Sequence, residues 1–175
     1  MPLRPAKCYT ALKGPAYTRR EYVGSGLQPK VVRFRMGNPH GDFDVEVKLV
    51  AKEAGQLRHN ALEAARLMAS KFLTTQLTEQ GYYLIIHPYP HHILRENKMM
   101  AFAGADRLQD GMRLAFGDPV GLAARVFEGS AVMSVRAKKD KVEVVKQALK
   151  RAASKLPVPC RIVVETLSDR EERLA

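Results

Sequence analysis

The fold class is decided by the segment Phe43-Asp44-Val45-Glu46-Val47-Lys48-Leu49. Apolar and charged side chains alternate strictly along it, which is typical of a β-strand with one buried face. The run 30–36 alternates in the same way, with Val32 on the inner side and Arg33 on the outer side. Because the turn-rich residues 37–41 lie between the two runs, we expect the two strands to form a hairpin.

Two arginines on the outer face of the first strand, Arg33 and Arg35, allow two interpretations. In a hairpin they would lie opposite Asp44 and Glu46 and form cross-strand ion pairs. They could equally contact phosphate groups of a nucleic acid, and the sequence leaves both interpretations open.

Two segments have helical periodicity. The first runs from about residue 53 to 77, with apolar residues three and four positions apart. The second begins near Asp140, which we expect to cap it with Glu143 three residues later, and ends before Pro157. The expected apolar stripes are Leu57, Ala61, Ala65, Met68 and Phe72 in the first helix, and Val142, Val145, Leu149, Ala152 and Leu156 in the second.

Further strands are expected at 82–88, 120–127, 131–136 and 160–165. The order is therefore β-β-α-β, a long irregular segment, and β-β-α-β again. This order predicts an α+β fold in which two helices pack on one face of a mixed sheet.

The chain is strongly basic. Its 175 residues contain 29 Lys and Arg against 18 Asp and Glu, a net charge of +11. Residues 1–35 hold eight of the cations and a single acid, Glu21, so this fifth of the chain carries +7 of the total. Such a charge favours a polyanionic partner, with nucleic acid ahead of an acidic membrane surface.

Residues 1–29 read as an extended basic arm, because they lack helical periodicity and are rich in Pro and Gly. Cations alternate there with Tyr9, Tyr17 and Tyr22, which suits phosphate contact combined with stacking on unpaired bases. The alternative is a solvated, disordered tail, but such tails contain few aromatic residues.

The segment 89–118 is too long for an ordinary connection and is expected to be a functional loop. His87, His91 and His92 lie at its start, but two intervening prolines exclude helical ligand spacing and no cysteine is near, so we predict no metal site. The chain has only Cys8 and Cys160, which excludes a disulfide scaffold. No apolar run is long enough to span a membrane.

Catalytic motifs are missing: the sequence contains no G-x-S-x-G elbow, no P-loop and no G-x-G-x-x-G that opens a helix. We therefore expect no enzyme and no cofactor. Two other hypotheses remain open: a small RNA-modifying or hydrolytic enzyme that uses the long loop as a lid, with His91 or Asp106 in its site, and a free-standing binder of nucleic acid or anionic membranes.

Five blocks of sequence resemble one family. They are residues 4–9 (RPAKCY), 15–22 (PAYTRREY), 58–66 (RHNALEAAR), 90–117 and 152–157 (AASKLP). They are similar to the large-subunit ribosomal protein called L-ten-e in archaea and eukaryotes, which is homologous to bacterial L-sixteen. The resemblance runs from about Pro2 to Glu165, and the short tail favours the archaeal branch. It is loose over 23–43, so no contact is assigned to Arg33 or Arg35.

The resemblance implies a β-hammerhead α+β fold bound to large-subunit rRNA beside the A-site tRNA corridor, near the peptidyl-transferase region, in a cytoplasmic ribosome. The partners that it implies are A-site tRNA, or alternatively P-site tRNA, neighbouring ribosomal proteins and the 5S rRNA region. The roles that it implies are tRNA positioning and late subunit assembly. It implies neither a membrane partner nor a homo-oligomer. The expected rRNA-binding residues are Arg4, Lys7, Tyr9, Lys13, Tyr17, Arg19, Arg20, Tyr22, Arg58 and Arg66. The expected loop residues near tRNA are Arg95, Lys98, Ala101, Phe102, Gly104, Arg107, Gly111 and Arg113.

The expected organisation is thus an RNA-threading arm at 1–29, a globular domain at 30–165 that includes the loop 89–118, and a short charged tail at 166–175. We expect the loop to become ordered only against its RNA partner.

Overall fold

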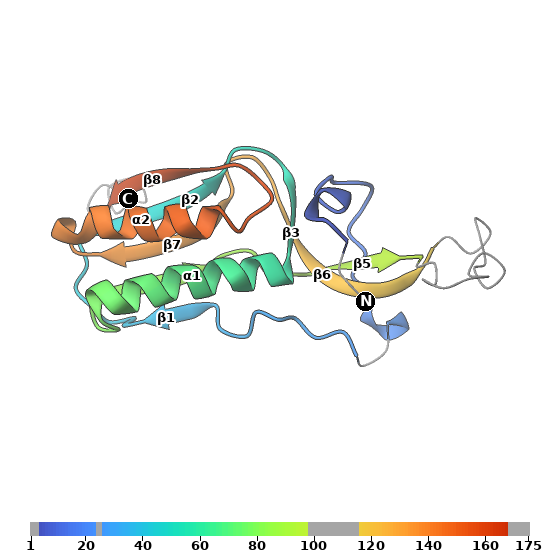
Figure 1. The fold of residues 1–175 in the computed structure, drawn as a ribbon, viewed down its shortest axis with the longest axis horizontal. Coiled ribbons are helices and arrows are strands. Elements are labelled where there is room, and N and C mark those ends of the chain that lie inside the picture. The colour runs from blue at the N-terminus through green and yellow to red at the C-terminus, as the bar shows by residue number, and fades with distance from the viewer. Residues whose placement is uncertain (1–3, 24–25, 98–115, 168–175) are drawn as a thin grey trace, which may run out of the picture.

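The computed structural model of the chain describes residues 4–23, 26–97 and 116–167. Within these ranges the molecule is elongated, with both long helices at one end and a smaller sheet at the other (Figure 1). The helices are α1 (His59–Leu77) and α2 (Val142–Ala153). The strands are β1 (Arg35–Gly37), β2 (Val45–Ala51), β3 (Gly55–Arg58), β4 (Tyr82–Ile86), β5 (His92–Glu96), β6 (Asp118–Val126), β7 (Ala131–Ala137) and β8 (Cys160–Thr166).

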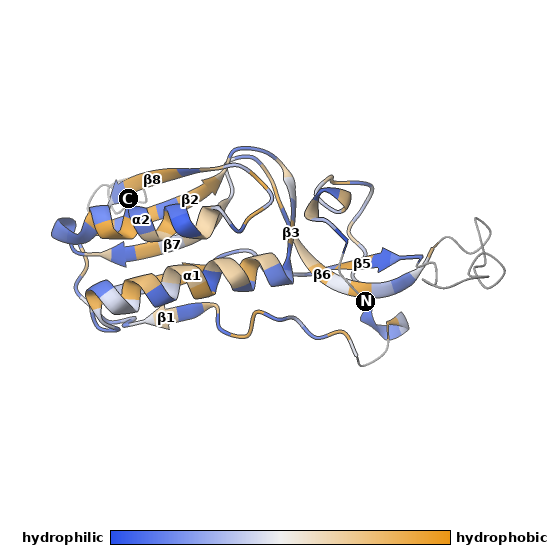
Figure 2. Ribbon diagram, viewed as in Figure 1, coloured by the Kyte–Doolittle hydropathy of each residue, from blue (hydrophilic) through white to orange (hydrophobic). Residues whose placement is uncertain are grey.

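The larger sheet has the strand order β1-β4-β7-β2-β8, and α1 and α2 lie side by side on one of its faces (Figure 1). The core lies between these layers, where Val47 and Leu49 of β2 meet Leu73 of α1 and Leu149 of α2. Both helices can bury a single face because their sequences are amphipathic, and α2 carries strongly hydrophilic as well as hydrophobic residues (Figure 2).

The smaller sheet has the order β3-β6-β5 and continues from the larger one. β2 leads into β3, and β6 leads into β7 through a turn at Gly129, whose φ of +80° suits a residue without a side chain. The Gly129 N–H donates to the carbonyl of Ala51, 3.0 Å away, and ties the turn to the end of β2. A pair of antiparallel segments therefore links the two sheets, which positions the smaller sheet beyond the helices.

The predicted α+β class, with two helices on one face of a sheet, is confirmed. The strands are arranged differently from the expected mixed sheet: every pair is antiparallel, and the pairs divide into two sheets. Among the described residues, neither helix is long and apolar enough to cross a membrane.

The predicted hairpin between 30–36 and 43–49 is wrong. β1 pairs with β4, with Met36 opposite Leu84, because both edges of β2 are already occupied by β7 and β8. Val32, expected inside, is 82% exposed. Arg35 lies opposite Ile85, so of the two interpretations of Arg33 and Arg35, the one with Asp44 and Glu46 directly across a hairpin ladder does not apply.

Two helix starts also differ from the predictions. Residues 55–58 form β3, so α1 begins at His59, and its buried stripe is Leu62, Ala65, Ala69, Leu73 and Leu77. The expected stripe is right at Ala65, and Phe72 packs partly buried against the core, but Met68 is 38% exposed. Apolar and small residues occupy two neighbouring rows of this helix, so the sequence pattern does not show which row faces the core. Asp140 does not cap α2: it lies in a 3-10 turn, and Lys141 occupies the N-cap without a side-chain hydrogen bond.

The segment 89–118 is not irregular throughout. β5 lies within it and pairs with β6, with Ile93 and Leu94 buried. The sequence pattern does not reveal this strand, because only two consecutive apolar residues mark it between His92 and Arg95.

Candidate nucleic-acid interface

The basic arm docks on the smaller sheet in the part of the chain that the structure describes. The N–H groups of Gln56 in β3 and Ile93 in β5 donate to the carbonyls of Thr10 and Tyr17, each at 2.9 Å. The side-chain amide of Gln56 donates to the carbonyl of Ala11 at 2.7 Å. The arm therefore has a defined path over the protein and does not extend freely into solvent.

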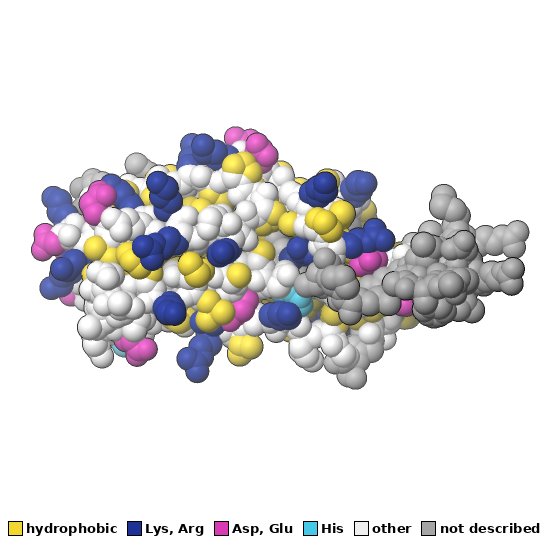
Figure 3. All heavy atoms as spheres, viewed as in Figure 1, with side chains coloured by type: hydrophobic (Ala, Val, Ile, Leu, Met, Phe, Trp, Pro, Cys, Tyr) yellow, Lys and Arg dark blue, Asp and Glu magenta, His cyan; other side chains and the backbone are white. Residues whose placement is uncertain are grey.

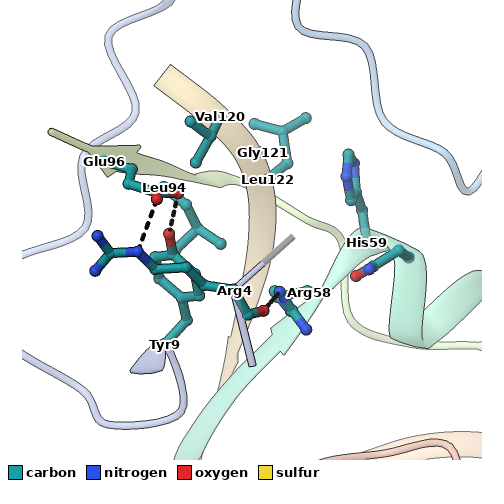
Figure 4. Close-up of a pocket in the computed structure, with 10 residues that line it drawn as sticks. Arg4, Tyr9, Arg58, His59, Leu94, Glu96, Val120, Gly121 and Leu122 are labelled. Atoms are coloured by element: carbon teal, nitrogen blue, oxygen red, sulfur yellow. Dashed lines mark hydrogen bonds and ion pairs between the residues drawn. The ribbon is translucent and has the colours of Figure 1, made fainter. Parts of the chain in front are cut away.

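Glu96, at the end of β5, holds the beginning of the arm (Figure 4). Arg4 Nε lies 2.7 Å from one carboxylate oxygen of Glu96, and the Tyr9 hydroxyl donates to the other at 2.9 Å. Arg58 Nη1 donates to the carbonyl of Arg4 at 2.8 Å. Burial, together with the hydrogen bond to Glu96, raises the pKa of Tyr9 to about 12, so the phenol stays protonated and keeps donating.

Tyr17 holds the second half of the arm. Its N–H donates to Nδ1 of His92 at 2.9 Å, which requires a neutral imidazole. Burial, and then the charge of Arg125, lower the pKa of His92 and favour that neutral form. The Tyr17 ring meets the ring of Phe116 edge-on, with centroids 5.8 Å apart.

Arg125 of β6 fixes the stretch between these two contacts. Its guanidinium donates to three consecutive carbonyls, those of Lys13 at 3.2 Å, Gly14 at 2.7 Å and Pro15 at 3.1 Å. Neither Arg125 nor Glu96 is among the residues predicted from the sequence. The sequence feature that could have pointed to Arg125 is a cation within an otherwise apolar strand. No sequence feature distinguishes Glu96 from other acidic residues.

Several predicted contact residues are engaged within the protein. Arg20 donates to the Tyr89 hydroxyl at 3.3 Å, and the guanidinium of Arg58 lies 5.7 Å from the centroid of the Tyr9 ring. Arg66 pairs with Glu63 on α1, and this hydrogen bond raises the pKa of Arg66. These side chains shape the arm and the helix surface.

The cations left for an anionic partner lie on the outside of the arm. Lys7, Lys13 and Arg19 are exposed, and their side chains make no ion pair or hydrogen bond within the described ranges. Tyr22 is 67% exposed, whereas Tyr9 and Tyr17 are partly buried. The structure therefore separates residues that hold the arm from residues that can face RNA.

Of the predicted loop residues, Arg95 is described and lies near the end of β5. The others fall outside the described residues; they are Lys98, Ala101, Phe102, Gly104, Arg107, Gly111 and Arg113.

The three histidines near the loop have separate hydrogen-bond partners. His87 Nε2 lies 2.9 Å from Ser134 Oγ, His91 Nδ1 lies 3.0 Å from the carbonyl of Tyr89, and His92 accepts from Tyr17. Among the described residues, no group of three or more His, Cys, Asp or Glu side chains is arranged to hold a metal ion.

Comparisons with known proteins agree on one family. A family model described as ribosomal protein L16p/L10e matches residues 12–163. A protein of Staphylothermus marinus named large ribosomal subunit protein uL16 is 65% identical over 167 residues, which cover 95% of this chain and 96% of that protein. Proteins with the same name from Hyperthermus butylicus and Sulfolobus acidocaldarius are 55% and 56% identical, and the matches cover 100% and 96% of this chain and 100% and 97% of the relatives.

Proposed function

Because this chain belongs to the ribosomal protein L16p/L10e family, we propose that its docked arm binds large-subunit rRNA near the A-site tRNA corridor and the peptidyl-transferase region. As a member of that family it is a structural constituent of the large ribosomal subunit and is ribosome-bound in the cytoplasm. It partners with rRNA and other ribosomal proteins, and the family is not catalytic. The similar proteins named above come from archaea.

The main observation in support of the proposal is that three exposed cations of the arm have no partner within the described residues. Lys7, Lys13 and Arg19 are exposed along a backbone that Glu96 and Arg125 hold in place. Because the arm is already positioned, its cations neutralise phosphates with less loss of conformational entropy than those of a free tail. Release of counterions from the RNA then supplies a large part of the affinity.

The second element of the proposal is the loop 89–118, whose base lies beside the docked arm. We propose that its residues approach bound tRNA, in the A site or alternatively in the P site, and support tRNA positioning. The support is the position of Arg95, which contacts the arm at Tyr17 and the far end of the loop at Phe116. In this proposal the protein lies close to the 5S rRNA region and joins the subunit late in assembly.

Replacing both Lys13 and Arg19 by Ala tests the arm. We expect weaker rRNA binding, and a plot of log affinity against log salt that is flatter by roughly 0.9 for each phosphate that the variant no longer neutralises. The matched control removes the exposed neighbours Lys138 and Lys139, which precede α2. Unchanged incorporation of the arm variant into subunits, or an equal effect of the control, would contradict the assignment.

Deleting residues 103–111 tests the loop. We expect impaired tRNA accommodation or subunit maturation, and the melting temperature is measured alongside as the control for folding. Normal translation by ribosomes that carry the deletion would remove the proposed role of the loop while leaving that of the arm intact.

A further inference from the structure

A hollow of about 460 Å³ opens on the helical face, away from the arm. Its lining residues are Met68, Lys71, Phe72, Thr75, Gln76 and Arg151. The first five come from α1 and the last from α2, so the hollow follows the seam between the two helices.

The hollow has an apolar floor that remains open to solvent. Met68 is 38% exposed, and Leu67, which precedes it in α1 but does not line the hollow, is 52% exposed. Phe72 packs against the core, and the guanidinium of Arg151 lies 4.0 Å from the centroid of its ring. Figure 3 shows hydrophobic side chains exposed over the two helices and interspersed with Lys and Arg side chains. Covering this floor with an apolar partner would therefore be favourable.

The charges around the hollow have one sign. Lys71 and Arg151 are its charged lining residues, and none of the lining residues carries a carboxylate. Neither side chain makes an ion pair within the described ranges. The rim is therefore complementary to carboxylates or phosphates, and the floor decides between them. Phosphates and sugars would gain little from contact with Met68 and Phe72, whereas aliphatic side chains of a protein would bury them.

We propose that the seam between α1 and α2 is a docking site for a segment of another protein whose aliphatic side chains are flanked by Asp or Glu. The segment would place its aliphatic groups on Met68 and Phe72 and its carboxylates against Lys71 and Arg151. This site is separate from the rRNA contact of the arm, so either assignment can fail without the other.

A synthetic peptide tests this chemistry with the full-length chain. The peptide is helical, about 15 residues or roughly four turns long, with Leu on one face and Glu beside it; a second peptide carries Lys in place of Glu. We expect the acidic peptide to bind and the basic one to fail. Equal binding of the two, or no binding of the acidic peptide, would overturn the proposal.

Two variants separate the floor from the rim. Leu67→Ser with Met68→Ser removes apolar surface in the hollow and next to it without a change of charge, and Lys71→Gln with Arg151→Gln removes charge. Each pair of substitutions should lower the affinity for the acidic peptide by about tenfold. Phe127→Ser, at a residue that is 63% exposed and lies outside the hollow, should leave this affinity unchanged. Unchanged affinity in either pair, with melting temperatures that show intact folding, would overturn the site.

A photo-crosslinking side chain in place of Met68 identifies the natural occupant, in assembled subunits and in chains not yet assembled. The proposal requires a crosslink to a protein segment of the stated composition in at least one of these states. A crosslink to rRNA, a crosslink to a second copy of this chain, or no crosslink in either state would each overturn it.

Discussion

The guanidinium of Arg95 lies 3.7 Å from the centroid of the Phe116 ring, and its Nε donates to the carbonyl of Phe116 at 3.1 Å. Arg95 is the penultimate residue of strand β5 and Phe116 precedes β6, so this contact joins the two sides of the loop where the loop leaves the sheet. Tyr17 of the arm completes the group, with its ring centroid 5.4 Å from the same guanidinium. One cation therefore holds the arm and both ends of the loop together.

Replacing Arg95 by Ala should destabilise this region by about 1–2 kcal/mol, because the variant lacks a carbonyl hydrogen bond and two cation–π interactions. Arg95→Lys should retain less than half of that stabilisation. A planar guanidinium can lie against an aromatic ring and still donate a hydrogen bond from its edge, whereas an ammonium group has no such plane. Urea unfolding measures both variants, with exposed Lys52→Ala as the control. A Lys variant as stable as the original chain would show that charge alone is sufficient.

Arg125→Met should release the middle of the arm while the sheet stays folded. The methionine retains the aliphatic packing but leaves the carbonyls of Lys13, Gly14 and Pro15 to water. Limited trypsin digestion should then cut at Lys13 and Arg19 several times faster, and hydrogen exchange of the core amides should be unchanged. Slow cleavage equal to that of the original chain would mean that Arg125 does not hold the arm.

Docking of the arm should weaken as the solution becomes acidic. The pKa of His92 is lowered in the folded protein, so the unfolded state binds a proton more readily, and stability is lost as pH falls below the ordinary histidine value of 6.5. The protonated ring cannot accept the N–H of Tyr17. Exchange of the Tyr17 amide, followed between pH 7 and pH 5 after correction for intrinsic rates, should accelerate.

The control for this experiment is His92→Gln, whose side-chain oxygen accepts a hydrogen bond without titrating in that range. Its corrected exchange rate should not change with pH. A pH response that persists in the Gln variant would assign the effect to another group.

Thr78→Gly should stabilise the protein by roughly 1 kcal/mol. Thr78 follows α1 with φ of 61° and ψ of 171°, a conformation that strains a β-branched residue and suits glycine. Thr75→Gly, at an exposed position inside α1, should instead cost roughly 0.3 kcal/mol, the difference between the helix propensities of Thr and Gly. Thermal unfolding compares them, and destabilisation by both would show that Thr78 is not strained in solution.

The elements that show a clear alternation or stripe of buried residues could be predicted from the sequence. The pairing of strands that compete for the same edge of a sheet could not. The alternation around Val47 and the stripe through Val145 and Leu149 reported the core directly. The pairing of β1 could not be read in this way, because it depends on β7 and β8 occupying both edges of β2.

The same limit applies to the candidate interface. Its charge and its tyrosines were visible in the sequence, but the division of roles among them was not. Tyr9 and Tyr17 hold the arm only because Glu96 and His92 reach them from positions 87 and 75 residues further along the chain. Local composition carries no information on such distant partners.

The arm is attached largely through main-chain oxygens, those of Thr10, Ala11, Tyr17 and the three residues held by Arg125. Every amino acid supplies that atom, proline included, so the route of the chain does not depend on which side chains it displays. A saturation library scored for docking of the arm should accordingly tolerate replacements at Ala11, Lys13 and Ala16 and reject them at Gln56 and Arg125. The path of the arm is determined by residues of the sheet on which it lies. The exposed side chains of the arm can therefore vary to suit the binding partner without changing that path.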